Sequence, residues 1–186
     1  YWNIPKSIAY KEKLPQLRRN PNALAAQNIR VFGPQGEINP GSVDWSAVGA
    51  SFPYRLRQDP GARNSLGRIK FMFPNSYDVY LHDTPSKGGF DLYARQASHG
   101  CVRLEKPRAL AEALLEGNET WTAEAIDKQL EGDKTVRARL VAQVPVYILY
   151  WTAFAAGDQM NFRSDPYNWD RELLQRVGVL ASGTKV

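Results

Sequence analysis

YLHDTPSKGGFDLYARQASHGCVRL, residues 80–104, contains both histidines and the single cysteine of a chain of 186 residues. His82 precedes Cys101 by 19 positions, and His99 precedes it by two. Packing alone can explain one cysteine, because free cysteines are among the most buried residue types. Two imidazoles so near one thiol instead favour a nucleophilic site, since an imidazole can accept the thiol proton.

The residues that lead into this stretch predict a β-hairpin. GRIKFMFP (67–74) and YDVYLH (77–82) both alternate apolar side chains with other residues, as strands do. Pro74-Asn75 between them favours a tight turn. We therefore expect His82 at the end of a strand, on the same face as Tyr80.

The residues after the stretch predict further helices and strands. Pro107 in a first turn, Thr122 as an N-cap and Gly132 as a terminator mark two of the helices. The predicted elements are helices over 106–117, 120–132 and 165–178, and strands over 134–140 and 144–155. Without regular βαβ alternation a doubly wound sheet is disfavoured, and the pattern favours an α+β, mainly β domain whose core is residues 67–186.

Residues 1–66 are rich in proline, glycine, asparagine and arginine and predict only short elements. NPNALAAQN (20–28) predicts a two-turn helix capped by Asn20, and IRVFGPQGEI (29–38) predicts a small hairpin. The rest is expected to be mostly loop, anchored by the aromatic residues Trp45, Phe52 and Tyr54. An inserted lid and an irregular surface without function fit these features equally.

Composition sets further limits. The chain carries a net charge of +5, with 43% hydrophobic and 23% charged residues, as in a soluble globular domain. The basic excess suits anionic partners, but no Lys/Arg-rich run or nucleic-acid motif is present, so no nucleic-acid partner is expected. No apolar run is long enough to span a membrane, and a single cysteine excludes an internal disulfide. The first residues carry no signal pattern, so we expect any anchor to lie upstream.

The sequence around Cys101 suits acyl transfer. Gly100 allows a sharp bend that brings backbone N–H groups near the sulfur, where they can hold the oxyanion of a tetrahedral intermediate. Either histidine can serve as the base: His99 shares a face with the thiol in an extended segment, and His82 sits on a rigid strand end. From the residues alone both remain open.

A metal site must also be considered. His82, Asp83, His99 and Cys101 offer nitrogen, oxygen and sulfur ligands for zinc. Their spacing matches no zinc pattern, and the chain has neither a second cysteine nor a third histidine. No metal is expected.

His82 followed by Ser98-His99-Gly100-Cys101-Val102-Arg103 resembles the catalytic motif of the L,D-transpeptidases, a family of bacterial cell-wall enzymes. The resemblance covers residues 67–115 and implies a β-sandwich catalytic domain with flanking helices. Residues 1–66 look like the capping insertion of the larger, membrane-anchored members. The opening residues resemble a place inside their catalytic domain, so one or more preceding strands are expected to be missing.

By matching position, the resemblance assigns roles to the motif residues. Cys101 would be the nucleophile and His82 the general base, with Ser98, His99 and Gly100 forming the oxyanion loop. Tyr80, Arg103 and Asp83 would contact substrate, although Arg103 fits a structural salt bridge equally well. Asp83 stands where many members have glycine. It would orient His82 through its carbonyl or, alternatively, stabilise the imidazolium through its carboxylate.

The resemblance also implies a reaction. The enzyme would release D-alanine from a peptidoglycan tetrapeptide stem and join two diaminopimelate residues in a 3→3 crosslink, without a cofactor. Carbapenems would acylate the same thiol. The location would be the periplasm or cell envelope, with an anchor in the inner membrane.

Three other functions are considered. An L,D-carboxypeptidase would use the same site, with water in place of the acceptor amine. A non-catalytic cell-wall binding module would carry a vestigial thiol, which the intact motif argues against. A papain-like peptidase is disfavoured, because that class places its cysteine before its histidine.

Overall fold

The computed structural model describes residues 1–49, 51–95 and 101–179. The chain divides into two compact units, Tyr1–Gln143 and Val144–Val186. The first unit contains two sheets and, of the motif residues, His82, Cys101, Val102 and Arg103.

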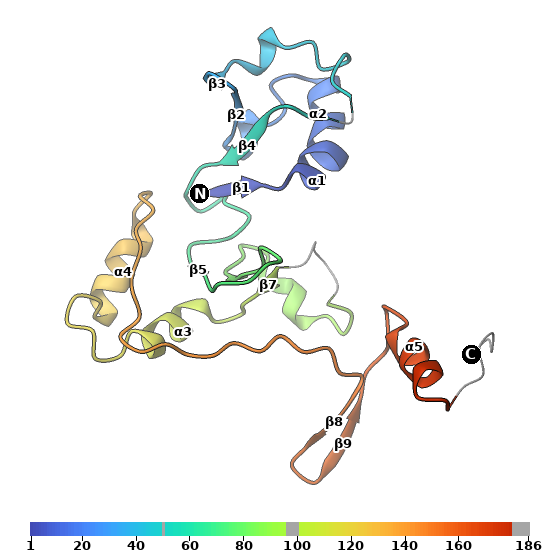
Figure 1. Cartoon of the computed structure of the whole chain (residues 1–186). Coiled ribbons are helices and arrows are strands. Elements are labelled where there is room, and N and C mark those ends of the chain that lie inside the picture. Colours follow the sequence, from blue (N-terminus) through green and yellow to red (C-terminus); the bar gives the residue numbers. More distant parts are fainter. Residues whose placement is uncertain (50, 96–100, 180–186) are drawn as a thin grey trace. The chain divides into compact units, whose positions relative to one another are not determined.

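The first sheet is antiparallel and four-stranded, in the order β1-β4-β2-β3 (Figure 1). Its strands are β1 (Trp2–Ile4), β2 (Ile29–Gly33), β3 (Gly36–Ile38) and β4 (Arg55–Gln58). The predicted hairpin over 29–38 is confirmed, with Gly33 opposite Gly36 across its turn. β1 pairs with β4, from Trp2 opposite Gln58 to Ile4 opposite Leu56. This pairing joins segments that are far apart in the sequence.

A buried apolar cluster packs on this sheet. Ile29 and Val31 alternate inward from β2, as a strand with one buried face requires. The segment α1 (Lys6–Ile8), a π-helical turn (Ala9–Lys13) and α2 (Leu14–Arg19) adds Leu14 and Leu17, which are at most 1% exposed. A fully buried leucine contributes about 2 kcal/mol. The cluster comprises Ile4, Ile8, Ala9, Leu14, Leu17, Leu24, Ile29, Val31, Trp45, Val48, Phe52 and Leu56.

Besides the loops, short helices and hairpin expected from the sequence, residues 1–66 thus contain a four-stranded sheet. The pairing of β1 with β4 supplies a sheet that local patterns do not reveal. The predicted anchoring by Trp45, Phe52 and Tyr54 is confirmed, because Trp45 and Phe52 are buried and Tyr54 packs on both rings at 5.1 and 5.9 Å.

The prediction of a two-turn helix over residues 20–28 is wrong. Asn20 is extended, with φ −151° and ψ 110°, as expected for a residue that precedes proline. It ends α2, and its side chain accepts a hydrogen bond from the Asn22 N–H. Only a 3₁₀ turn over Ala25–Gln27 follows, and it ends at Asn28 with a left-handed φ of 54°.

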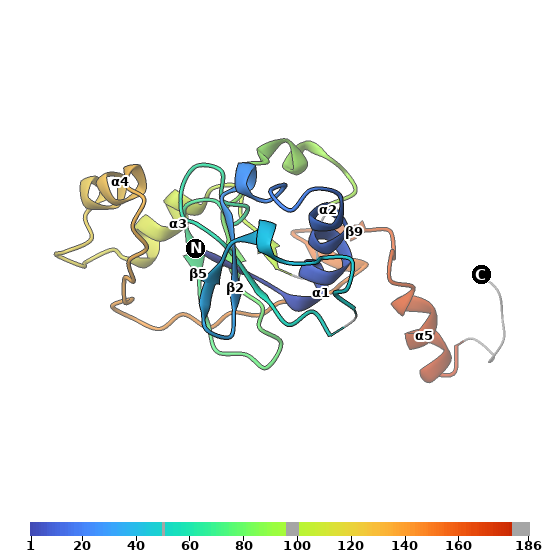
Figure 2. The same cartoon turned by 90° about the horizontal axis from the view of Figure 1, so that it is seen from above.

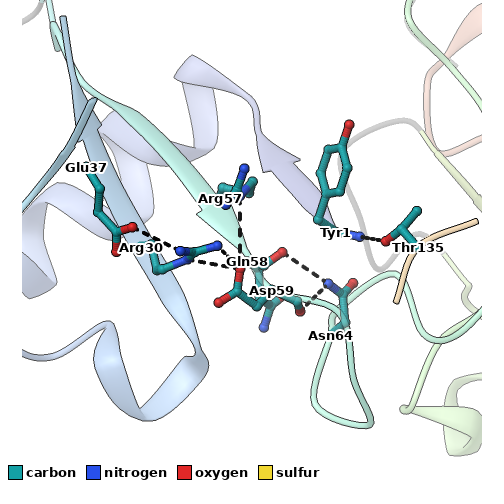
Figure 3. A network of polar contacts seen from close by, with 8 residues as sticks. All are labelled: Tyr1, Arg30, Glu37, Arg57, Gln58, Asp59, Asn64 and Thr135. Carbon is teal, nitrogen blue, oxygen red and sulfur yellow. Dashed lines mark hydrogen bonds and ion pairs between the residues drawn. The ribbon is translucent and has the colours of Figure 1, made fainter. Parts of the chain in front are cut away.

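Polar contacts order the loop that leaves the first sheet (Figure 3). Arg30 on β2 bonds the Asp59 and Glu37 carboxylates at 2.8 and 2.9 Å. The buried Asn64 amide donates to the Asp59 carbonyl at 2.9 Å. The N-terminal amine of Tyr1 donates to Thr135 at 3.0 Å. These contacts fix the exit of β4 toward the second sheet.

The second sheet has three strands of two residues each: β5 (Lys70–Phe71), β6 (Leu81–His82) and β7 (Val102–Arg103). β5 and β6 are antiparallel, so the predicted pairing is confirmed, whereas β6 and β7 are parallel. The predicted strands are longer than those observed. The Asn75 side chain bonds four backbone groups between Phe73 and Val79, and Asp78 has a φ of 57°. A structured loop thus replaces the tight turn.

Two predicted helices follow as α3 (Pro107–Leu114) and α4 (Ala123–Glu131). The Thr122 hydroxyl caps α4 by accepting from the Ala125 N–H, and Gly132 follows its last residue. Arg108 on α3 bonds both Asp127 carboxylate oxygens on α4, at 2.8 and 3.0 Å. Figures 1 and 2 both show the two helices as neighbours.

The second unit contains β8 (Ala153–Ala156) paired with β9 (Gln159–Phe162), followed by α5 (Trp169–Arg176). The helix is the one predicted over 165–178. The strands predicted over 134–140 and 144–155 are absent except at 153–155, because within the described residues no strand lies beside them to complete a ladder. The apolar residues of 144–151 are largely exposed: Val144, Val146, Tyr147, Ile148, Leu149 and Trp151.

The mixture of sheets and separate helices confirms the α+β class. The "mainly β" description is wrong, since the described residues include at least as much helix as strand. The β-sandwich, the capping role of residues 1–66 and the boundary at 66/67 stay predictions. Among the described helices, none is both long and apolar enough to cross a bilayer.

Candidate active site

Parallel pairing of β6 with β7 brings the ends of the motif together. Leu81 lies opposite Val102, and His82 lies opposite Arg103. The Val102 N–H donates to the Tyr80 carbonyl at 3.2 Å, and the Leu104 N–H donates to the His82 carbonyl at 2.8 Å. Cys101, one residue before β7, therefore enters the sheet beside Tyr80.

Tyr80 lies beside the thiol. The residue is 8% exposed, and Cys101 and Trp2 of β1 are both near enough to its hydroxyl to shift its pKa. The indole N–H of Trp2 can only donate, so the phenol proton is available to the sulfur. Burial, followed by the charge and hydrogen bond of Cys101, raises the pKa of Tyr80. Tyr80 is thus a neutral donor at physiological pH.

His82 is held as a neutral base. It is 4% exposed, and its Nδ1 bonds the Asp83 carbonyl, which can only accept. The proton must therefore sit on Nδ1, and the Nε2 lone pair is the basic site. Burial lowers the pKa of His82, and the positive charges of Arg103 and Lys70 lower it further, against the opposing bond to Asp83. Its ring lies edge-on to Tyr80 at 5.9 Å.

Of the two roles considered for Asp83, the structure has the first, with the carbonyl bonded to His82. Its carboxylate is 13% exposed and pairs with Lys87 at 2.8 Å, and it accepts from the Arg68 N–H at 2.8 Å. Burial raises the pKa of Asp83, but hydrogen bonds from Lys87, Arg68 and Thr84 outweigh burial and lower it. The carboxylate is therefore engaged by its own chain.

Gly67 makes room for that carboxylate. Its φ is +63°, and a Cβ there would lie 2.3 Å from Cγ and Oδ2 of Asp83 and 2.5 Å from its Cβ. Such distances are far inside van der Waals contact. Position 83 can therefore carry a side chain in this fold only if position 67 is glycine.

Sequence reasoning missed Lys70, which lies opposite His82 across β5 and β6. Its Nζ is 3.7 Å from the centre of the Tyr80 ring, a cation–π distance. The pKa of Lys70 is lowered overall, because burial lowers it by more than the negative charges of Cys101 and Asp78 raise it. The alternation of residues 67–74 was visible in the sequence, but the register that pairs Lys70 with His82 was not. Trp2 was missed because it reaches Tyr80 from the other sheet.

Arg103 is partly buried on β7, opposite His82. Within the described residues its Nε has no hydrogen-bond partner, and no ion pair with it is seen there. Its role as a substrate contact stays a prediction. Ser98, His99 and Gly100 lie outside the described residues, so the predicted oxyanion loop does too. In the described ranges no three metal-ligating side chains gather.

The arrangement suits thiolate chemistry. A partly buried thiol, a neutral imidazole with its basic nitrogen free of the Asp83 carbonyl, a phenol donor and the cation of Lys70 occupy one small sheet. Hydrogen-bond donors and positive charge are the surroundings in which cysteines act as nucleophiles in proteins.

Comparison with known proteins agrees with this chemistry. Residues 1–142 match the YkuD family, described as the L,D-transpeptidase catalytic domain. A protein of Haemophilus influenzae named "Putative L,D-transpeptidase" is 36% identical over 173 residues. The match covers 92% of this chain and 35% of that protein, so the chain spans about a third of its relative's length.

Proposed function

Since the chain belongs to the YkuD family of L,D-transpeptidase catalytic domains, we propose that it forms 3→3 crosslinks in peptidoglycan through a Cys101 thioester. The observation that carries the proposal is the cluster of thiol, Tyr80 hydroxyl and neutral His82 imidazole where β6 and β7 meet.

In the first half-reaction, His82 Nε2 takes the proton of the Cys101 thiol. The sulfur attacks the carbonyl carbon between diaminopimelate and D-alanine in a tetrapeptide stem, and the carbonyl electrons move to oxygen. When the tetrahedral intermediate collapses, the C–N bond breaks and the imidazolium gives its proton to the departing amine. D-alanine leaves, and the stem remains on sulfur as a thioester.

In the second half-reaction, the side-chain amine of a second diaminopimelate attacks the thioester. His82 accepts a proton from that amine, the C–S bond breaks, and the sulfur leaves as a thiolate that recovers the proton. The new amide is the 3→3 crosslink. Water in place of the amine would give the L,D-carboxypeptidase reaction. No step needs a cofactor, since thiolate, imidazole and hydrogen-bond donors cover each one.

The surrounding groups support these steps. The Tyr80 hydroxyl stabilises the thiolate by a hydrogen bond, and Lys70 adds positive charge beside it. Arg103, with an unpartnered Nε within the described residues, is available to a carboxylate of the stem. Residues 1–66 would cap the substrate groove, and the enzyme would act in the periplasm or envelope, held by an anchor outside this chain.

The test is product analysis with purified disaccharide–tetrapeptide. We expect a crosslinked dimer and free D-alanine by mass spectrometry, and neither product from Cys101→Ala. If tripeptide monomer is the only peptidoglycan product, the L,D-carboxypeptidase function is favoured over the transpeptidase function. No product, with no carbapenem adduct on Cys101 by intact mass, would refute both enzymes and favour a binding module.

A further inference from the structure

We propose that Asp83 and Lys87 are positioning residues that fix the separation between His82 and Cys101. Together with the carbonyls of Leu104 and Glu105 they form what we call the Asp83–Lys87 clamp. The inference rests on the proposed function, because it assigns the clamp to the same pair of reacting groups.

Lys87 joins the chain after the base to the chain after the nucleophile. Its Nζ donates to the Asp83 carboxylate at 2.8 Å, to the Leu104 carbonyl at 3.2 Å and to the Glu105 carbonyl at 2.9 Å. An ammonium group has three donors, so all of them are used. Asp83 directly follows His82, and Leu104 directly follows β7.

The other side of the carboxylate reaches the third strand. The Arg68 N–H donates to Asp83 at 2.8 Å, and the Asp83 N–H donates to the Ile69 carbonyl at 2.8 Å, just before β5 begins. The clamp therefore ties the start of β5 to the ends of β6 and β7. All three strands are held at the same end of the sheet.

This sheet needs such support. Each of its strands has two residues, so its backbone ladder is short and resists sliding weakly. Reacting groups must meet within a few tenths of an ångström, and a misplacement of about 1 Å can cost roughly 100-fold in rate. A contact that continues the pairing past the strand ends preserves that separation.

An ordinary surface ion pair does not explain the geometry. Lys87 and Asp83 are four residues apart, as in many exposed pairs, but two of the three acceptors of Lys87 lie 17 and 18 residues away. Through these backbone carbonyls the Lys87 ammonium bridges the segment after His82 and the segment after β7, instead of pairing only within its own turn.

The experiment compares Lys87→Met, Lys87→Arg and Asp83→Asn with the parent chain. The matched control is Arg108→Met, which removes a cation of similar exposure, 41% against 46%, that joins α3 to α4. Two readouts are taken: kcat and KM for D-alanine release, and the rate of Cys101 alkylation by iodoacetamide as a function of pH.

For Lys87→Met we expect kcat to fall at least tenfold with KM within twofold, and the alkylation profile to move toward that of His82→Ala. Lys87→Arg, which keeps the charge and a donor, should recover part of both. Asp83→Asn should change kcat and the alkylation profile in the same direction as Lys87→Met, but by less. If Lys87→Met does not fold, Asp83→Asn becomes the deciding variant. Arg108→Met should match the parent.

Parent-like kcat and parent-like alkylation in Lys87→Met would overturn the clamp, as would equal losses in Lys87→Met and Arg108→Met. Failure of the proposed function looks different. The parent itself would then release no D-alanine, while the alkylation profiles would still report whether Lys87 positions the thiol beside the imidazole.

Discussion

Replacing Gly67 with alanine should destabilise the first unit far more than the same change at Gly117. Both glycines are left-handed, with φ +63° and +79°, but a Cβ at 117 meets nothing within 4 Å. A Cβ at 67 would lie 2.3 Å from the Asp83 carboxylate. The left-handed backbone costs alanine about 1–2 kcal/mol at either site.

The extra cost at Gly67 comes from displacing Asp83. Its bond from the Arg68 N–H is a hydrogen bond to a charged group, worth about 1.5–3 kcal/mol. The pair with Lys87, which is half exposed, adds about 0.5–1 kcal/mol. Gly67→Ala should therefore lose about 2–4 kcal/mol more than Gly117→Ala.

Urea unfolding followed by tryptophan fluorescence measures both losses. A second substitution sharpens the test: Asp83→Gly on the Gly67→Ala background should recover stability, whereas Asp83→Ala should not, because the Cβ of Asp83 is itself 2.5 Å from the new methyl. Equal losses at 67 and 117, or recovery by Asp83→Ala, would refute the steric reasoning.

Three further outcomes are expected. Tyr80→Phe removes the hydroxyl that we expect to donate to the Cys101 sulfur. It should lower kcat/KM by about 10- to 100-fold, the worth of one hydrogen bond to a charged group, and parent-like kinetics would contradict such a bond. Because the pKa of His82 is lowered in the fold, the unfolded state binds a proton at a higher pH than the folded state does. The contribution of His82 to the free energy of unfolding should therefore be complete above about pH 6.5 and decrease below it. In urea unfolding between about pH 5 and 7.5, His82→Gln should remove that dependence. Lys70→Met should slow Cys101 alkylation by iodoacetamide at neutral pH by several-fold, since a cation beside the sulfur is lost, and its rate should become less sensitive to added salt than that of the parent.

Local patterns in the sequence predicted much of the fold correctly. The hairpin at 29–38, the cap at Thr122 and the pairing of the segments around Lys70 and His82 each depend on residues close together in the chain. The face shared by Tyr80 and His82 also followed from alternation, and their rings are in contact.

Pairings between distant segments were not predictable in the same way. Nothing near Trp2 indicates that Gln58 will be its partner, so residues 1–66 looked irregular although they contain a sheet. The strand expected over 144–155 is missing at 144–152 for the converse reason. Its apolar residues suit a strand, but pairing depends on a neighbour and not on the segment itself.

The candidate site was likewise predictable only in part from the sequence. The motif gave the residue types, but their relations depend on register and side-chain direction. Whether Asp83 would meet His82 through its carbonyl or its carboxylate could not be decided until Gly67 and Arg68 were seen around that carboxylate. Lys87 was passed over because its carbonyl acceptors lie beyond the cysteine.

The fit between Gly67 and Asp83 also constrains how this protein can change over generations. A side chain at position 67 would collide with any side chain at 83, whereas glycine at 67 leaves position 83 free to carry one. The two positions are thereby coupled: while Asp83 is present, any substitution of Gly67 by a residue with a side chain loses stability.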